Sequence, residues 1–448
     1  MSYILIKGGV DTLLKNHYIC LLLMNKEVEQ NLMKKSITTA FLLSILSIFS
    51  LTSQVQLNDS AKISLMTVSP WTGAIYSLYG HTVLRVEDDS TGIDLAFNYG
   101  YFDSSQPNFM YHFIKGETDY VLGVTSYEDF LAENQMKGLE VVQQELNLTV
   151  LEKQQLWEDL YINSLPENRK YRYNFLFDNC ATRPRDIVEK VINKPVIYPA
   201  TNSNQTFRDL IHECVNEFKW MKFGIDLMIG SDADNYITDR EKMFLPSYLM
   251  HAFADAEVHK QDTTNSSLVK YTDTILKSEN KEVARGEWMS INPGAIAFAL
   301  LIITVLISFL QFKVNNEKTV RIYDTVLFSI AGIAGIVVSF LVFFSEHPTV
   351  NTNWNIVWLH FIHLVFAVLF WVKSLEKVVY YYHFINFAVL SLFLVGWYFI
   401  PQQLPWATIP FAMSLWMRSG ANFFIQRKAF LKDKQFKSAK YMQAGWRR

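Results

Sequence analysis

The stretch INPGAIAFALLIITVLISFLQ, residues 291–311, contains no charged residue and is long enough to cross a bilayer as a helix. Four more apolar stretches follow it, at 323–344, 354–372, 382–400 and 404–424. Each is about long enough to cross a hydrocarbon core of ~30 Å. We therefore predict that residues 290–425 form a bundle of five transmembrane helices.

The loops between these stretches alternate in charge. The first and third contain lysine or arginine, whereas the second, Ser345 to Asn353, and the fourth, around Pro401 to Pro405, contain neither. The tail, residues 426–448, is strongly basic. Because basic loops stay in the cytoplasm, we predict that the second and fourth loops face outward and that the C-terminus is cytoplasmic.

Several polar residues lie on or near the outward-facing second loop. His347, Asn353 and Trp354 lie on it or beside it, and His360 and His363 lie in the third apolar stretch. Ionisable groups inside a membrane are costly and often functional. Neutral histidines and interfacial tryptophans that anchor a bundle also explain them, and this is the interpretation that we favour.

Overall composition narrows the class of protein. The 448 residues are 50% hydrophobic, 15% aromatic and 19% charged, which excludes a disordered, collagen-like or coiled-coil protein. The length suggests two or three domains. With 41 basic and 43 acidic residues the net charge is −2, which argues against nucleic acid as a partner. Three cysteines are too few for a disulfide scaffold.

Residues 33–53, MKKSITTAFLLSILSIFSLTS, have the order of a secretory signal peptide: two lysines, an apolar run and a small polar end. Signal peptides begin at the initiator methionine, so we expect translation to start at Met33 and residues 1–32 to be a misannotated upstream extension. An uncleaved anchor is the alternative. In either case residues from 54 onward are exported.

Residues 54–259 are predicted to form an exported α+β domain. Alternation predicts strands at 62–68, at 81–88 (HTVLRVED) and at 92–102 (GIDLAFNYGYF). Helical spacing follows at 127–163, at 181–192 (ATRPRDIVEKVI) and at 206–221. Residues 260–289 begin with a polar, lysine-rich stretch and are predicted to be a linker to the membrane.

The common catalytic and metal-binding motifs do not occur in this domain. There is no G-x-S-x-G elbow, P-loop, H-E-x-x-H or C-x-x-C. The stretch SDADNYITDREK resembles a calcium loop, but Ile237 replaces the required glycine and Met243 the closing glutamate. We therefore interpret Asp232, Asp234 and Asp239 as solvated turn carboxylates, and expect no metal and no organic cofactor.

Cys180 is the candidate nucleophile. It follows a short extended run and stands at or just before a helix N-terminus, where unpaired amides and the helix dipole stabilise a thiolate. The same amides can hold an oxyanion during acyl transfer. Arg183 and Arg185 add positive charge, and together with Asn179 they are candidates for contacting substrate or an oxyanion. The alternative is a structural disulfide between Cys180 and Cys214.

A thiol nucleophile needs a base, and His81 is the candidate. It begins a strand directly after Gly80, and Asn98 on the next strand is placed to orient its imidazole. His112 and His212 are competitors. A lone histidine is more often structural, so spacing alone leaves this choice open.

Four stretches of the exported domain resemble motifs of a known family. YGHTVLRV, FNYGYF, NFLFDNCATRPRD and FLPSYL, in that order, resemble the N-terminal periplasmic domain of the bacterial Lnb family of lipoprotein N-acyltransferases. The resemblance covers about 64–255 and, in layout, the membrane part. The order of histidine and cysteine is also similar to permuted papain-like thiol enzymes of the NlpC and lecithin retinol acyltransferase type. Ala181 and Thr182 replace the glutamate and histidine of the latter group.

The resemblance implies that Cys180 is the nucleophile and His81 its general base, with Asn98 as a weaker orienting assignment. It implies a multipass protein of the inner membrane with its N-terminal domain in the periplasm. The acyl donor would be a membrane phospholipid, and the acceptor the N-terminal amine of a diacylated lipoprotein. Two other functions stay open: a cell-wall peptidase or amidase of NlpC type, and a non-catalytic envelope scaffold.

Overall fold

The computed structural model describes residues 55–102, 104–105, 107–201, 204–259, 265–279, 291–314 and 317–445. The expected upstream extension, the signal peptide and part of the expected linker lie outside these residues. The described residues from Leu57 onward belong to one compact unit.

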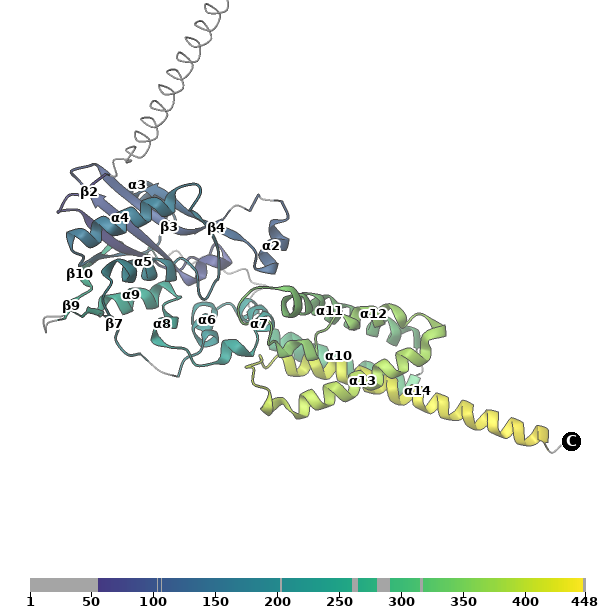
Figure 1. The fold of residues 1–448 in the computed structure, drawn as a ribbon. Coiled ribbons are helices and arrows are strands. Elements are labelled where there is room, and N and C mark those ends of the chain that lie inside the picture. Colours follow the sequence, from purple (N-terminus) through teal and green to yellow (C-terminus); the bar gives the residue numbers. More distant parts are fainter. Residues whose placement is uncertain are drawn as a thin grey trace, which may run out of the picture. The chain divides into compact units, whose positions relative to one another are not determined.

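A seven-stranded antiparallel sheet organises the exported domain (Figure 1). Its order is β10-β5-β1-β2-β3-β4-β6. The strands are β1 (Lys62–Val68), β2 (His81–Asp88), β3 (Ile93–Tyr101), β4 (Asp119–Ser126), β5 (Val141–Leu146), β6 (Lys170–Arg172) and β10 (Val269–Leu276). A small second sheet contains β7 (Val196–Ile197), β8 (Glu257–Val258) and β9 (Ser266–Ser267).

Alternation along β2 sends its side chains into two different cores. Leu84 and Val86 join the larger core, which includes residues of α4 (Val150–Ser164), α5 (Thr182–Ile192) and α9 (Pro246–Ala254). Val83 joins a smaller core on the other face, with Phe130 of α3 (Tyr127–Met136). A strand buried on both faces fixes its register firmly, so the residue that begins β2 is held in a defined position.

The remaining elements of the domain are short. They are η1 (Ile75–Tyr79), α2 (Phe109–Lys115), α6 (Phe207–Val215), α7 (Lys219–Met228), η2 (Ser231–Asp234) and α8 (Asp239–Lys242). Thr206 and Asp209 form a capping box at the start of α6, and Thr238 and Glu241 form one at α8. These caps satisfy amides that a short helix would otherwise leave unpaired.

The predicted α+β class is confirmed, and so are the strands at 62–68 and 81–88 and the helix after Cys180. Three expectations need correction. The helical prediction for 127–163 misses β5, and that for 206–221 misses the break between α6 and α7. The predicted linker contains β9 and β10, because VKYTDTIL is an edge strand and most of its residues, from Lys270 to Thr274, are exposed.

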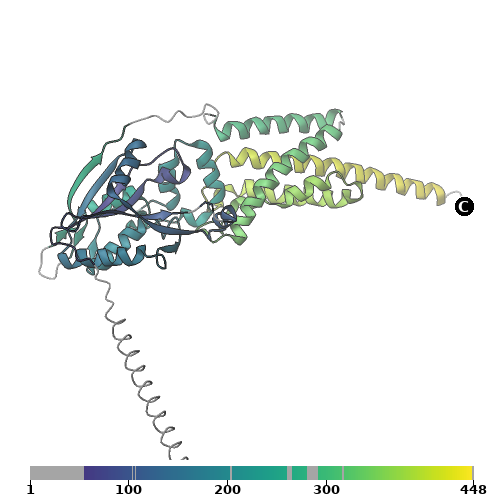
Figure 2. The same ribbon diagram turned by 90° about the horizontal axis from the view of Figure 1, so that it is seen from above.

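The C-terminal part is helical, coloured green to yellow in Figure 2. It contains α10 (Pro293–Val314), α11 (Glu317–Phe344), η4 (Trp354–Val357), α12 (Ile362–Leu369), η5 (Lys373–Leu375), α13 (Glu376–Val395), η6 (Trp397–Phe399) and α14 (Thr408–Gly445). Among the described residues, three helices are long and apolar enough to cross a membrane: Pro293–Lys313, Glu317–Phe344 and Lys373–Val395. The expected count of five spans stays a prediction.

The other two expected spans differ from simple apolar helices. The third corresponds to a shorter apolar stretch, Trp354–Leu369. The fifth, in α14, contains the fully buried Arg418, which donates to both carboxylate oxygens of Asp324 on α11, at 2.5 and 3.0 Å. Ser308, Gln311 and Asn422 complete this polar cluster. A charge inside a membrane bundle is tolerated when it is paired in this way, and the pair joins α11 to α14.

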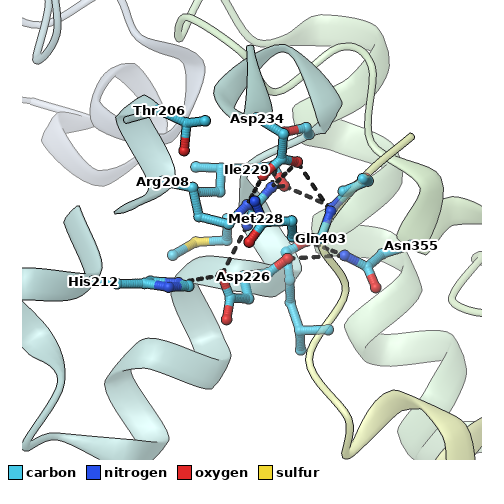
Figure 3. A network of polar contacts seen from close by, with 12 residues as sticks. Thr206, Arg208, His212, Asp226, Met228, Ile229, Asp234, Asn355 and Gln403 are labelled. Carbon is cyan, nitrogen blue, oxygen red and sulfur yellow. Dashed lines mark hydrogen bonds and ion pairs between the residues drawn. The ribbon is translucent and has the colours of Figure 1, made fainter. Parts of the chain in front are cut away.

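Polar contacts also join this domain to the second and fourth loops of the helical part (Figure 3). The buried Arg208 pairs with Asp226 at 2.8 Å and with Asp234 at 2.6 Å. The side-chain amide of Asn355 donates to the backbone oxygen of Asp226, and the backbone N–H of Gln403 donates to Asp234. This network, which we call the Arg208 network, links α6 and α7 to the loops before α12 and α14.

Two sequence-based interpretations change as a result. Asp232 is exposed as expected, but Asp234 is a buried ion-pair partner and not a solvated carboxylate, because Arg208 neutralises it. The second loop does more than anchor a bundle. Asn353 donates to the backbone oxygens of Leu227 and Met228, so this loop binds the exported domain directly.

Candidate active site

Asn179 fixes the position of Cys180. Its side-chain oxygen accepts hydrogen bonds from the backbone N–H groups of Ala181, at 2.8 Å, and Thr182, at 2.9 Å. These amides lie at the start of α5, so the Asn179 side chain closes the turn that leads into this helix. Cys180 therefore lies in a tightly held turn at a helix N-terminus, where the sequence predicted it.

The side-chain nitrogen of Asn179 donates two hydrogen bonds. It donates to the backbone oxygens of Phe175, at 2.6 Å, and Phe244, at 2.9 Å. Asn179 is buried, so it serves the architecture of the turn and has no donor left for a substrate oxyanion. Phe244 begins the FLPSYL stretch, so this contact packs that stretch against the turn that contains Cys180.

His81 lies beside the thiol, at the start of β2. Its ring lies next to the Cys180 side chain: a Cβ built on Gly100 would meet both, and each group shifts the pKa of the other. Its Nε2 lies 3.0 Å from the side-chain oxygen of Asn98 on β3, so Nδ1 is the nitrogen left for the sulfur. Asn98 is 4% exposed, whereas His81 and Cys180 are each partly exposed. A buried amide thus orients a reachable imidazole and thiol.

The two reactive groups favour each other's charged form. Burial alone would raise the pKa of Cys180, but the charge and hydrogen bond of His81 and the backbone amides of Thr82 and Cys180 bring that pKa below its usual value. Burial alone would lower the pKa of His81, but Cys180 and Asn98 raise it overall. Both shifts go in the direction that favours a thiolate–imidazolium pair.

Gly100 keeps the space beside the pair open. Its φ of +113° lies in the region that favours glycine, at an irregularity in the β3–β4 pairing. A Cβ built there would lie 3.7 Å from Cys180 Cβ and 3.9 Å from His81 Cε1. A side chain at this position would therefore strain the backbone and occupy the approach to the thiol.

The two arginines proposed for substrate contact are engaged in ion pairs. Arg183 pairs with Asp178 at 2.5 Å, and its guanidinium lies 3.6 Å from the ring centre of Tyr171. Arg185 pairs with Asp186 at 2.8 Å and is buried. Both therefore stabilise the start of α5, and neither makes a contact that points to substrate binding.

Three tyrosines, which we call the tyrosine wall, lie within electrostatic range of the thiol, and the sequence reasoning missed them. Burial, with the charge of Cys180 as the next cause, raises the pKa of Tyr120 to about 12, and the same two causes raise the pKa of Tyr171 and Tyr173. The rings of Tyr120 and Tyr173 stack at 4.0 Å. The spaced tyrosines of KYRYNFLF, directly before the cysteine, are the signal that could have indicated this wall.

Cys214 is not part of the site. Both cysteines among the described residues are free, which contradicts the predicted alternative of a Cys180–Cys214 disulfide. Burial raises the pKa of Cys214 to about 11, so this thiol stays protonated. The other candidate bases are engaged elsewhere: His112 contacts Glu117, and His212 contacts Asp226. Within the described residues, no cluster of three or more metal-binding side chains occurs.

Comparison with known families identifies the chain. Residues 50–212 match the Lnb N-terminal periplasmic domain, and residues 285–429 match the Lnb transmembrane domain. The chain belongs to the Lnb family. No curated protein and no solved structure matches it. A permuted papain-like fold therefore stays a prediction, whereas a membrane protein with an N-terminal periplasmic domain is shown. Lnb membership suggests a membrane-bound enzyme of lipoprotein maturation.

Proposed function

We propose that this Lnb protein is a thiol acyltransferase that moves an acyl chain from a membrane phospholipid to the N-terminal amine of a diacylated lipoprotein. The observation that carries the proposal is the contact of Cys180 with His81, oriented by Asn98, on a domain bonded to the outer loops of a membrane protein.

In the first half-reaction, the Cys180 thiolate attacks the ester carbonyl of the phospholipid. A carbon–sulfur bond forms, and the carbonyl oxygen becomes an oxyanion. When the intermediate collapses, the carbon–oxygen ester bond breaks and His81 donates its proton to the leaving oxygen. The products are a lysophospholipid and an acyl thioester on Cys180.

In the second half-reaction, the free amine of the lipoprotein's N-terminal cysteine attacks the thioester carbonyl. His81, now neutral, accepts the proton that the attacking nitrogen loses. The carbon–sulfur bond breaks, which leaves an amide on the lipoprotein and restores the thiolate–imidazolium pair. A thioester reacts readily with amines, so the covalent intermediate suits conversion of an ester into an amide.

Backbone amides are placed to stabilise the oxyanion. The backbone N–H groups of Thr82 and Cys180 lie close enough to the sulfur to help lower the pKa of the thiol. A carbonyl carbon bonded to that sulfur brings its oxygen within the same field of donors, which come from β2 and from the turn before α5. The predicted side-chain candidates are not required for this task.

The membrane contacts favour acyl transfer over cell-wall hydrolysis. Both substrates of the proposed reaction are embedded in the bilayer, so attachment of the thiol domain to membrane helices raises their local concentration. The Arg208 network and the Asn353 contacts hold the domain against the outer loops. A soluble peptidoglycan peptide gains nothing from this arrangement. The C-terminus is proposed to be cytoplasmic, from the basic tail.

The test is mass spectrometry of lipoprotein N-termini in cells whose only copy carries Cys180→Ser. We expect loss of the amide-linked acyl chain with the diacylglyceryl group intact, and Cys214→Ser serves as the matched control. Unchanged N-acylation in Cys180→Ser cells would refute the proposal. Cleavage of muropeptides by the purified wild-type protein would favour the peptidase instead.

A further inference from the structure

The helix α2 displays an unusual number of apolar side chains. None of its seven residues is buried, and Met110 is 65% exposed and Phe113 42% exposed. Tyr111 and Ile114 are exposed as well. A soluble domain rarely leaves such a cluster in water, and a patch of this kind commonly marks contact with a membrane or a partner.

Contacts with the second loop bring α2 to the outer end of the membrane helix α11. The backbone N–H of Glu346 donates to the oxygen of Lys115 at 2.7 Å, and Ser345 Oγ donates to the oxygen of Ile114 at 3.0 Å. The ring of His347 donates to the oxygen of Phe113 at 2.7 Å. Three separate bonds therefore fix the C-terminal end of α2 directly beyond Phe344, the last residue of α11.

Gly116 makes this close approach possible. Its φ is +80°, and a Cβ built there would lie only 2.8 Å from the backbone nitrogen of His347. Only glycine fits both the left-handed conformation and the short distance. The seam between α2 and the second loop is thus a built contact between two backbones.

Ring contacts place α2 at the depth of the last turn of α11. Tyr111 meets Phe340 with ring centres 6.1 Å apart, and Phe343 and Phe344 beside it are exposed. The exposed apolar surface of a membrane helix faces lipid. Since α2 is continuous with that surface, its own exposed side chains lie at the boundary between acyl chains and headgroups. Arg172 and Glu346 form an ion pair at the same seam, as suits a headgroup layer.

A row of aromatic rings runs from α2 to the thiol. Phe109 of α2 stacks on Phe102 at 5.6 Å, and Phe102 contacts Tyr120 at 5.2 Å. Tyr120 stacks on Tyr173, whose neighbour Asn174 pairs with Asp178, two residues before Cys180. An acyl chain that leaves the bilayer at α2 therefore first meets the partly exposed rings of Phe109 and Phe102.

We propose that α2 lies in the outer leaflet and that its apolar side chains, with the rings from Phe109 to Tyr173, receive the acyl chain of the phospholipid that acylates Cys180. This inference rests on the proposed function and adds the surface through which the donor enters. The occupant is a bilayer phospholipid, because the patch continues the lipid-facing surface of α11.

The first experiment detects lipid contact without requiring activity. Full-length Cys180→Ser protein is placed in vesicles of phosphatidylethanolamine and phosphatidylglycerol, with a fraction of the phosphatidylethanolamine carrying a diazirine in one acyl chain. After irradiation, we expect adducts on peptides containing residues 109–115. Adducts confined to α10, α11, α13 and α14 would overturn the inference.

The second experiment tests use of the surface. The double variant Met110→Gln/Phe113→Gln is compared with Met136→Gln/Leu151→Gln, two side chains on α3 and α4 that are 78% and 82% exposed. Loss of two lipid contacts should lower transfer from vesicle phospholipid about tenfold or more, while the control pair keeps wild-type transfer. Alkylation of Cys180 by iodoacetamide should be unchanged in both.

Each remaining outcome separates this inference from the proposed function. Equal loss of transfer in the two double variants, or slower alkylation in the α2 variant, would show a general or structural effect and overturn the inference. Adducts on α2 in a protein whose wild-type form transfers no acyl chain would support lipid contact and refute the acyltransferase.

Discussion

Replacing Asn98 separates an orienting role from a structural one. Its side-chain oxygen accepts a hydrogen bond from His81 Nε2 at 3.0 Å in a buried position. A hydrogen bond to a charged group contributes about 1.5–3 kcal/mol. At about 1.4 kcal/mol for each tenfold change, Asn98→Ala should lower the rate of acyl transfer by about 10- to 150-fold.

The pH dependence of the transfer rate shows in which direction Asn98 shifts the pKa of His81. The hydrogen bond from Asn98 helps to raise the pKa of His81, and the imidazolium is lost as the pH rises through that pKa. Asn98→Ala should therefore move the basic limb of the profile to lower pH. Asn98→Asp places a carboxylate beside the imidazolium, so it should move the same limb to higher pH. In both variants the acidic limb reports protonation of the Cys180 thiolate.

The assay follows transfer of a labelled acyl chain from vesicle phosphatidylethanolamine to a diacylated lipopeptide, from pH 5 to pH 10. The matched control is Asn134→Ala, which removes another buried asparagine whose amide donates to Phe130 within α3. It should lower stability without moving either limb. A rate within about twofold of wild type and an unmoved basic limb in Asn98→Ala would refute the orienting role.

Three further predictions follow from single contacts. At pH 7 iodoacetamide should alkylate Cys180 at least about tenfold faster than Cys214, whose burial raises its pKa to about 11; equal rates in peptide mass spectra would contradict this. Gly100→Ala should lower the free energy of unfolding by about 1–3 kcal/mol and abolish transfer. Gly224 has open space around it and no positive φ, so Gly224→Ala should change neither the thermal unfolding nor the rate of transfer. Arg208→Met leaves Asp226 and Asp234 buried without their partner, so the full-length protein should lose about 3–5 kcal/mol, and an unchanged melting temperature would count against the Arg208 network.

The sequence predicted the strand that carries His81 because its signal is local. HTVLRVED is rich in β-branched residues and has turn residues on both sides, and β2 covers the same eight residues. The helix after Cys180 was predictable for the same reason, with Pro184 in its first turn. These two elements bring the thiol and the imidazole together, so the central pair of the candidate site followed from the sequence and its resemblance.

Elements that depend on distant partners were missed. β5 contains two glutamines and a glutamate, and its strand character comes from pairing with β1 and β10, one of them more than 120 residues away. β10 has the polar composition of a linker because it is an edge strand with most of its residues exposed. Local spacing carries no information about either partner.

The buried charges were equally hidden. Arg208 pairs with carboxylates 18 and 26 residues further along the chain, and Arg418 pairs with a carboxylate 94 residues before it. In the sequence these are ordinary charged residues, and only the fold shows that they are desolvated and paired. The same holds for α2, whose apolar residues resemble a core helix until its contacts with the second loop are known.

The most direct measurement of the central claim is the mass of the Cys180 peptide after full-length protein is incubated with phosphatidylethanolamine vesicles and no acceptor amine. We predict one added acyl chain on this peptide, removable by neutral hydroxylamine and transferred when a diacylated lipopeptide is supplied. A Cys180 peptide that stays unmodified while N-acylated lipopeptide still accumulates in the complete reaction would contradict the account.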